Sequence, residues 1–174
     1  MEPNLKNIRA FAFDVDGVLT DGSMICLGDG DLLRTVNAKD CTAMRIAADK
    51  GYPTAVISGG ETEALRKRCL RSGVKPENTF LGCRGKMPYF LKFCEQNGLK
   101  PEEVAYFGDD LADIPLLRVS GLGIVPADAA PEAKLAADYV CYNPGGHCAA
   151  REGIEMVMKA RGDWKFDENY TSVY

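Results

Sequence analysis

The sequence lacks the features that mark several common classes of protein. Its 174 residues include a single histidine, His147, and the seven cysteines contain no C-x-x-C pair, so a zinc site with paired cysteine ligands is not expected. The formal net charge of −4 argues against a nucleic-acid partner, which usually requires a basic face. No apolar run is long enough to span a bilayer, and the polar residues 1–4 do not resemble the start of a signal peptide. We therefore expect a cytoplasmic protein with reduced thiols and no membrane partner.

Repeats, low-complexity segments and linkers are also absent, and 46% of the residues are hydrophobic, so we expect one domain over residues 1–174. Short apolar runs alternate with segments of helical pattern. The expected strands are 8–13, 54–57, 104–107, 122–125 and 139–141, and the expected helices are 40–50, 61–71, 87–96, 111–119 and 149–160. This alternation, with short connections, predicts an α/β fold with a Rossmann-like parallel sheet and helices on both of its faces.

A small insertion follows the first expected strand. The run Gly-Asp-Gly-Asp at residues 28–31 separates two apolar runs, 24–27 and 32–36, and predicts a β-hairpin over about residues 22–37. This hairpin is the only insertion at that point, so no large cap domain is expected. Composition alone does not distinguish a contact surface from an edge without a function.

Acidic residues follow two of the expected strands. Residues 14–17 read Asp-Val-Asp-Gly, and residues 108–113 read Gly-Asp-Asp-Leu-Ala-Asp. Taken singly, the first is also compatible with an acidic turn, and the second with a helix start whose acids complement the dipole. An EF-hand loop is excluded because its later ligand positions and terminal glutamate are missing. Strand ends of a parallel sheet share one crevice, where clustered carboxylates repel one another, so a hard cation such as Mg²⁺ is expected there.

Two further residues suit the binding of a phosphate group. Ser58 lies where strand 54–57 ends, and its hydroxyl with nearby backbone N–H groups could hold a phosphate oxygen. Lys86 directly precedes the helix 87–96. By themselves these residues are compatible with a helix cap and a solvated surface lysine.

The order of these four elements along the chain resembles the haloacid dehalogenase superfamily of phosphotransferases. The resemblance implies that Asp14 is the nucleophile, and that Asp16 protonates the leaving alkoxide and then deprotonates the attacking water. It further implies that Mg²⁺ is held by Asp14, the backbone carbonyl of Asp16, and Asp109. Ser58 and Lys86 would hold the phosphoryl oxygens. Asp113 would orient Lys86 or a metal-bound water, with Asp110 as a candidate partner.

Nearly the whole chain resembles a capless family within that superfamily, the 3-deoxy-D-manno-octulosonate 8-phosphate phosphatases. The segments that carry this resemblance are 14–22, the hairpin, 37–40, Arg45, Arg68, 106–113, 125–129 and 145–152, where Cys148 replaces a usual glycine. The resemblance implies a homotetramer in which hairpins pack together and each neighbour helps to cover a site. The substrate-binding residues it implies are Asp16, Asn37, Ala38, Lys39, Asp40, Cys41, Arg45, Gly59, Arg68 and Lys86.

One departure leaves alternatives open. The family commonly has Thr-Gly-Arg where this chain has Ser58, Gly59 and Gly60, so an arginine that is expected to contact substrate is missing. The expected reaction is hydrolysis of octulosonate 8-phosphate in lipopolysaccharide precursor synthesis, with 2-keto-3-deoxy-nononate 9-phosphate as the alternative substrate. An alternative of another class is a non-catalytic tetramerisation domain related to sugar-acid activating enzymes, although the catalytic carboxylates are present. A phosphoacceptor signalling domain is not favoured, because there the reactive aspartate follows a later strand.

The roles of the two arginines and of the C-terminal tail have two interpretations. Arg45 and Arg68 suit the sugar carboxylate through paired hydrogen bonds, but surface arginines on helices are common. The tail, residues 163–174, is expected either to reach an adjoining site, as in relatives, or to be a frayed terminus.

Overall fold

A single parallel sheet organises the chain. The computed structural model describes residues 4–28 and 30–165. The sheet has six strands: β1 (Ala10–Phe13), β4 (Thr54–Ile57), β5 (Thr79–Phe80), β6 (Val104–Phe107), β7 (Leu122–Val125) and β8 (Tyr139–Val140). Their order across the sheet is β5-β4-β1-β6-β7-β8. Every neighbouring pair is parallel. All residues of β1, β4, β6 and β7 are buried, as is usual for parallel strands covered on both faces.

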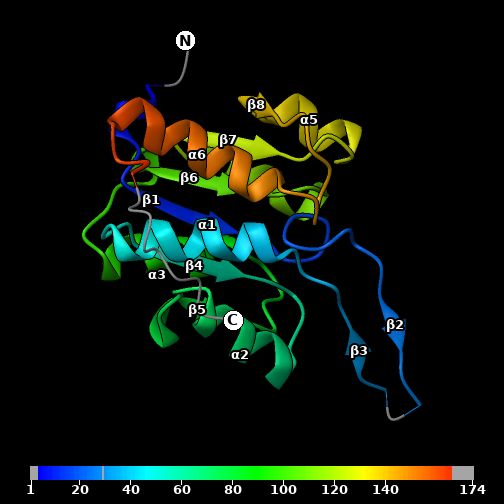
Figure 1. Ribbon diagram of the computed structural model, residues 1–174. Coiled ribbons are helices and arrows are strands. Elements are labelled where there is room, and N and C mark those ends of the chain that lie inside the picture. The colour runs from blue at the N-terminus through cyan, green and yellow to red at the C-terminus, as the bar shows by residue number, and fades with distance from the viewer. Residues whose placement is uncertain (1–3, 29, 166–174) are drawn as a thin grey trace.

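Helices cover both faces of the sheet (Figure 1). They are α1 (Ala38–Asp49), α2 (Glu63–Arg71), α3 (Met87–Gln96), α4 (Ile114–Val119), α5 (Pro131–Ala136) and α6 (Ala149–Arg161). Alternate residues of β1 enter different cores: Phe11 and Phe13 pack with α1 and α6, whereas Ala10 and Ala12 pack with α3, α4 and α5. This two-sided alternation is what the period of a strand requires.

The predicted hairpin is present and projects from the body of the protein (Figure 1). Its strands, β2 (Ile25–Cys26) and β3 (Leu32–Leu33), pair antiparallel. The hairpin exposes apolar side chains, with Ile25 at 63% and Leu33 at 51% of their accessible surface. Exposed apolar side chains of this size on a projecting element are typical of a contact surface.

The predicted fold class is confirmed, but the short strand β5 and the short helix α5 were not predicted. β5 has two residues and α5 has six, so neither is long enough to show a period in the sequence. The predicted helix 111–119 is a 3-10 turn, Leu111–Asp113, followed by α4. No helix within the described residues is long and apolar enough to cross a membrane. Most of the predicted tail, residues 166–174, lies outside the described residues.

Candidate active site

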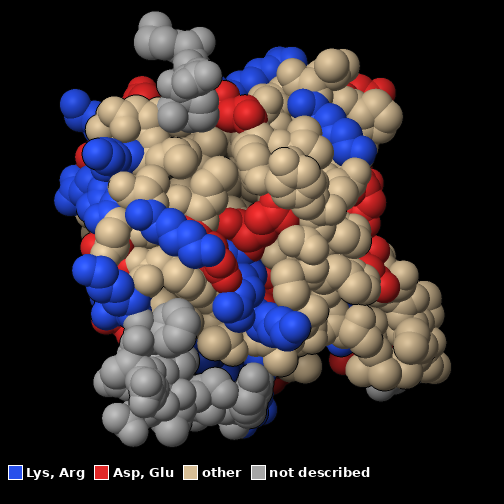
Figure 2. Space-filling view, turned by 45° about the horizontal axis from the view of Figure 1, so that its top comes forward, with Lys and Arg blue, Asp and Glu red and all other residues tan. Residues whose placement is uncertain are grey.

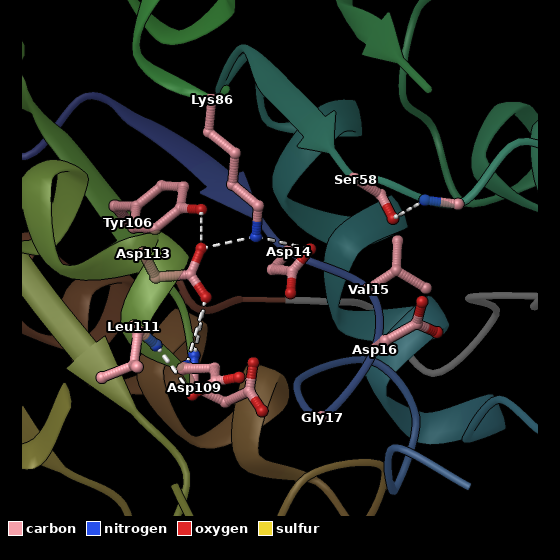
Figure 3. A network of polar contacts seen from close by, with 12 residues as sticks. Asp14, Val15, Asp16, Gly17, Ser58, Lys86, Tyr106, Asp109, Leu111 and Asp113 are labelled. Carbon is pink, nitrogen blue, oxygen red and sulfur yellow. Dashed lines mark hydrogen bonds and ion pairs between the residues drawn. The ribbon is translucent and has the colours of Figure 1, made fainter. Parts of the chain in front are cut away.

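The predicted catalytic residues meet at one edge of the sheet (Figure 3). Asp14 follows β1, Ser58 follows β4, and residues 109–113 follow β6. These three strands are neighbours in the sheet, so their carboxyl ends lie side by side. Lys86 stands at the start of α3 and extends into the same place.

Three carboxylates form the centre of the site. Asp14, Asp109 and Asp113 each offer one oxygen, and these oxygens all lie within 4.8 Å of one another. Burial, which outweighs the attraction of Lys86, raises the pKa of Asp14 to about 7. Burial and repulsion from Asp14 and Asp113 also raise the pKa of Asp109 to about 7. Both shifts mean that Asp14 and Asp109 do not readily ionise together unless a cation lies between them.

Asp113 holds the rest of the site in position. Its Oδ1 accepts hydrogen bonds from Lys86 Nζ at 2.6 Å and from the Tyr106 hydroxyl at 2.5 Å. Its Oδ2 accepts from the backbone N–H groups of Asp109 at 3.1 Å and Asp110 at 3.3 Å. Because both oxygens are occupied, Asp113 is suited to orient its neighbours and not to bind a metal directly. Asp110 contributes through its backbone, and its side chain caps the turn that follows by accepting from Leu111 N–H.

Lys86 links this network to Asp14. Its Nζ lies 2.9 Å from Asp14 Oδ1, and its side chain is only 9% exposed. Burial disfavours the ammonium form, but the carboxylates of Asp14 and Asp113 outweigh that effect and raise the pKa of Lys86. The lysine is therefore a fixed positive charge beside the predicted nucleophile.

Asp109 lies directly against the loop after β1. A Cβ atom at Gly17 would lie 2.0 Å from Asp109 Oδ2, and Gly17 has a φ of +90°. Only glycine satisfies both the backbone conformation and the close approach of the carboxylate. The oxygens of Asp14 and Asp109 thus form a pair of hard donors, the type of ligand that Mg²⁺ binds.

Asp16 and Ser58 lie on the other side of Asp14 from Asp113 (Figure 3). Ser58 is buried, and its Oγ accepts a hydrogen bond from Gly60 N–H at 3.1 Å. Asp16 forms a two-point ion pair with Arg34, with distances of 2.6 Å from Nε to Oδ1 and 3.1 Å from Nη2 to Oδ2. Arg34 was not predicted as a site residue, since a lone arginine at the end of a hairpin strand carries no sequence signal. Tyr106 belongs to a motif quoted above, but its hydrogen bond to Asp113 was likewise not predicted.

The structure corrects the expectation for Asp40. Its side chain is fully buried, and its two oxygens accept hydrogen bonds from the backbone N–H groups of Cys148 at 3.0 Å and Arg151 at 2.7 Å. Burial of the carboxyl group raises its pKa. Asp40 therefore caps the first turn of α6, and its carboxylate is not free to contact a ligand.

The other predicted substrate contacts have partners within the described chain. Arg45 bonds Asp49 Oδ1 at 3.1 Å and the carbonyl oxygen of Arg71 at 3.4 Å. Arg68 Nε lies 3.2 Å from Cys41 Sγ, which joins α2 to α1. The remaining predicted residues occupy the cap and first turn of α1 and the loop after β4: Asn37, Ala38, Lys39 and Gly59. Their contact with a substrate stays a prediction.

Comparisons with known proteins agree with this geometry. Residues 86–146 match the family model described as haloacid dehalogenase-like hydrolase. The chain is similar to the 3-deoxy-D-manno-octulosonate 8-phosphate phosphatase of Salmonella typhi, with 36% identity over 163 residues, covering 94% of this chain and 85% of the relative.

Solved structures extend the comparison to the fold. The crystal structure of the Yersinia pestis phosphatase of the same description has a TM-score of 0.89 and 30% identity, covering 97% of this chain and 89% of the other. The Moraxella catarrhalis phosphatase, described as a complex with a magnesium ion, a phosphate ion and a KDO molecule, has a TM-score of 0.87 and 28% identity. That match covers 92% of this chain and 91% of the other.

Proposed function

This chain belongs to the family of 3-deoxy-D-manno-octulosonate 8-phosphate phosphatases, and we propose that it hydrolyses that ester to the free sugar acid and inorganic phosphate. The observation that carries the proposal is the buried Asp14 carboxylate, 2.9 Å from Lys86 Nζ and grouped with Asp109. The complex described for the Moraxella relative supports the substrate. The comparisons do not favour the nononate ester or a non-catalytic domain. The reaction belongs to the synthesis of a lipopolysaccharide precursor.

In the first step, Asp14 attacks phosphorus, and the bond from phosphorus to the sugar oxygen breaks. Asp16 donates a proton to the leaving oxygen, which would otherwise depart as a poor alkoxide. In the second step, Asp16 takes a proton from water, and that water attacks the aspartyl-phosphate and releases inorganic phosphate. Lys86 and Ser58 hold the phosphoryl oxygens throughout, and Asp113 keeps Lys86 aimed at them.

The donor set fits Mg²⁺. Asp14, Asp109 and the backbone carbonyl of Asp16 would hold the ion, because their oxygens are hard donors and both side chains resist ionising without a cation. When bound, Mg²⁺ supplies positive charge that offsets the repulsion between a carboxylate nucleophile and a phosphate dianion. Asp113 is not included, since both of its oxygens accept other hydrogen bonds.

We also propose that the protein is a single cytoplasmic domain that forms a homotetramer through its hairpins. The support is the exposed apolar surface of the hairpin, which includes Met24, Ile25 and Leu33 and is mostly uncharged on the face shown in Figure 2. Neighbouring chains would then help to cover a site that has no large cap. Sedimentation of an Ile25→Lys variant checks this, because a charge at that position is expected to produce monomers.

A panel of sugar phosphates with Mg²⁺ tests the substrate. Octulosonate 8-phosphate is expected to be hydrolysed with a higher kcat/KM than the nononate 9-phosphate and hexose 6-phosphates. If it is cleaved no faster than the hexose esters, the proposed substrate is wrong.

An Asp14→Asn variant tests the mechanism. It is expected to fold normally and to lose essentially all turnover, whereas a surface control, Glu77→Gln, keeps wild-type rates. Trapping the phosphoenzyme with borohydride and mapping the modified peptide is expected to identify Asp14. Modification at a different residue would reject covalent catalysis at this carboxylate.

A further inference from the structure

Arg34 stands on the hairpin, and its charged side chain turns back to pair with Asp16 in the active site. It directly follows β3, and although Leu33 beside it is half exposed, the Arg34 side chain is only 7% exposed. Its guanidinium donates hydrogen bonds from Nε and Nη2 to the two carboxylate oxygens of Asp16. A planar two-point pair of this kind fixes the orientation of a carboxylate far better than one contact does.

Gly60 makes the room for this arginine. A Cβ atom at residue 60 would lie 2.8 Å from Arg34 Nη2 and 3.4 Å from Ser58 Oγ. Gly60 is not among the glycines with positive φ, so its backbone does not require glycine. The space above Gly60 is therefore occupied by the guanidinium of Arg34, which lies beside the hydroxyl proposed to bind the phosphoryl group.

Arg34 Nη1 is buried, and within the described residues it donates no hydrogen bond. A buried charged donor left unsatisfied is costly, and such groups are rare in proteins unless a ligand or water completes them. Nη1 belongs to the same guanidinium whose Nη2 binds Asp16 and lies against the Gly60 position, beside the proposed phosphoryl site.

We propose that Arg34 is a positioning residue of the proposed phosphatase reaction: it aims Asp16 at the leaving oxygen and donates Nη1 to an anionic oxygen of the bound sugar-acid phosphate. The inference rests on the function proposed above for the same site. It gives the hairpin a chemical task in addition to its contact surface. It also assigns to Arg34 the space that a longer side chain at residue 60 would need.

The dependence on the leaving group tests this role. An Arg34→Met variant is assayed with octulosonate 8-phosphate and with p-nitrophenyl phosphate, whose leaving group departs without a proton. The expected result is a loss of about 10- to 100-fold in kcat for the sugar ester, because acid catalysis commonly contributes that much or more, and a raised KM. Turnover of the aryl ester is expected to fall by less than about threefold, since it does not need the acid.

Two further variants separate positioning from packing. Arg34→Lys is expected to recover only part of the loss, since an ammonium does not form the two-point pair. In the double variant Arg34→Met, Gly60→Arg, an arginine extending from residue 60 places a guanidinium in the space that Arg34 vacates. The double variant is expected to hydrolyse the sugar ester faster than Arg34→Met alone. A surface control, Arg118→Met, is expected to behave as wild type.

Two results would overturn the inference while leaving the phosphatase intact: unchanged kcat/KM of Arg34→Met for the sugar ester, or equal losses for both esters. The second result would mean that the arginine does not act through the acid step, and thermal denaturation of the variant would show whether it only supports the fold. A wild-type protein that cleaves neither ester would instead refute the proposed function, and the role of Arg34 with it.

Discussion

Replacing Asp40 tests whether this residue binds substrate or holds the fold together. The N-cap residue of α6, Cys148, has a φ of +79° and makes no side-chain cap of its own. Asp40 supplies the missing acceptors from α1, with hydrogen bonds of 3.0 Å to Cys148 N–H and 2.7 Å to Arg151 N–H. An Asp40→Ala variant would leave two N–H groups of the first turn of α6 without acceptors.

The expected loss of stability follows from those two hydrogen bonds. Each bond to a charged acceptor contributes roughly 1.5–3 kcal/mol, and a helix cap about 1 kcal/mol. Burial of the Asp40 carboxylate, which also raises its pKa, offsets part of this gain. We therefore expect a net loss of about 3 kcal/mol, which corresponds to a fall in Tm of roughly 6–12 °C for a domain of this size.

Urea denaturation followed by circular dichroism measures the change. A matched control is Thr62→Ala, which removes an ordinary cap of α2 and is expected to cost about 1 kcal/mol. Asp40→Asn keeps one acceptor oxygen and is expected to lose about half as much as the alanine variant. If Asp40→Ala kept wild-type stability and instead raised KM, then Asp40 would be a substrate contact, and its assignment as a cap would be refuted.

Three other predictions concern stability and the catalytic network. Asp14 and Asp109 have folded pKa values of about 7 against 3.8 unperturbed, so the folded metal-free protein binds more protons than the unfolded chain. The stabilisation that these extra protons give the folded state is fully present below about pH 4 and is lost as pH rises toward 7. For one such carboxylate, the free energy of unfolding measured with urea in EDTA should therefore fall by about 3 kcal/mol between pH 5 and pH 8. Added Mg²⁺ should reverse the fall at pH 8, and a flat profile would contradict the assignment. Tyr106→Phe removes the buried hydroxyl bound to Asp113 and should cost about 1 kcal/mol with a reduced kcat; an unchanged kcat would show that Lys86 is held without it. Cys148→Gly relieves the positive φ and should add about 1 kcal/mol, seen as a Tm higher by about 2–4 °C, whereas a lower Tm would mean that the cysteine side chain contributes more than the strain costs.

Much of the site could be predicted from local patterns. Apolar runs ended by acidic or hydroxyl residues at Asp14, Ser58 and Asp109 mark strand ends, and parallel strands bring their ends to one edge. β5 and α5 were missed because a period cannot be recognised in two or six residues. Lys86 lies at the same edge, because the start of α3 faces it.

The choice of partners was decided only by the tertiary structure. The sequence by itself determined which residues carry charge, which turns need glycine and where the strands end. It did not determine that Arg34 would pair with Asp16 beside Gly60. Nor did it determine that Asp40 would accept hydrogen bonds from Cys148 and Arg151, which follow it by 108 and 111 residues. Such pairs depend on how the hairpin folds back and how α1 packs on α6. Carboxylates that look alike in the sequence therefore acquire different tasks from burial and from the donors that folding places around them.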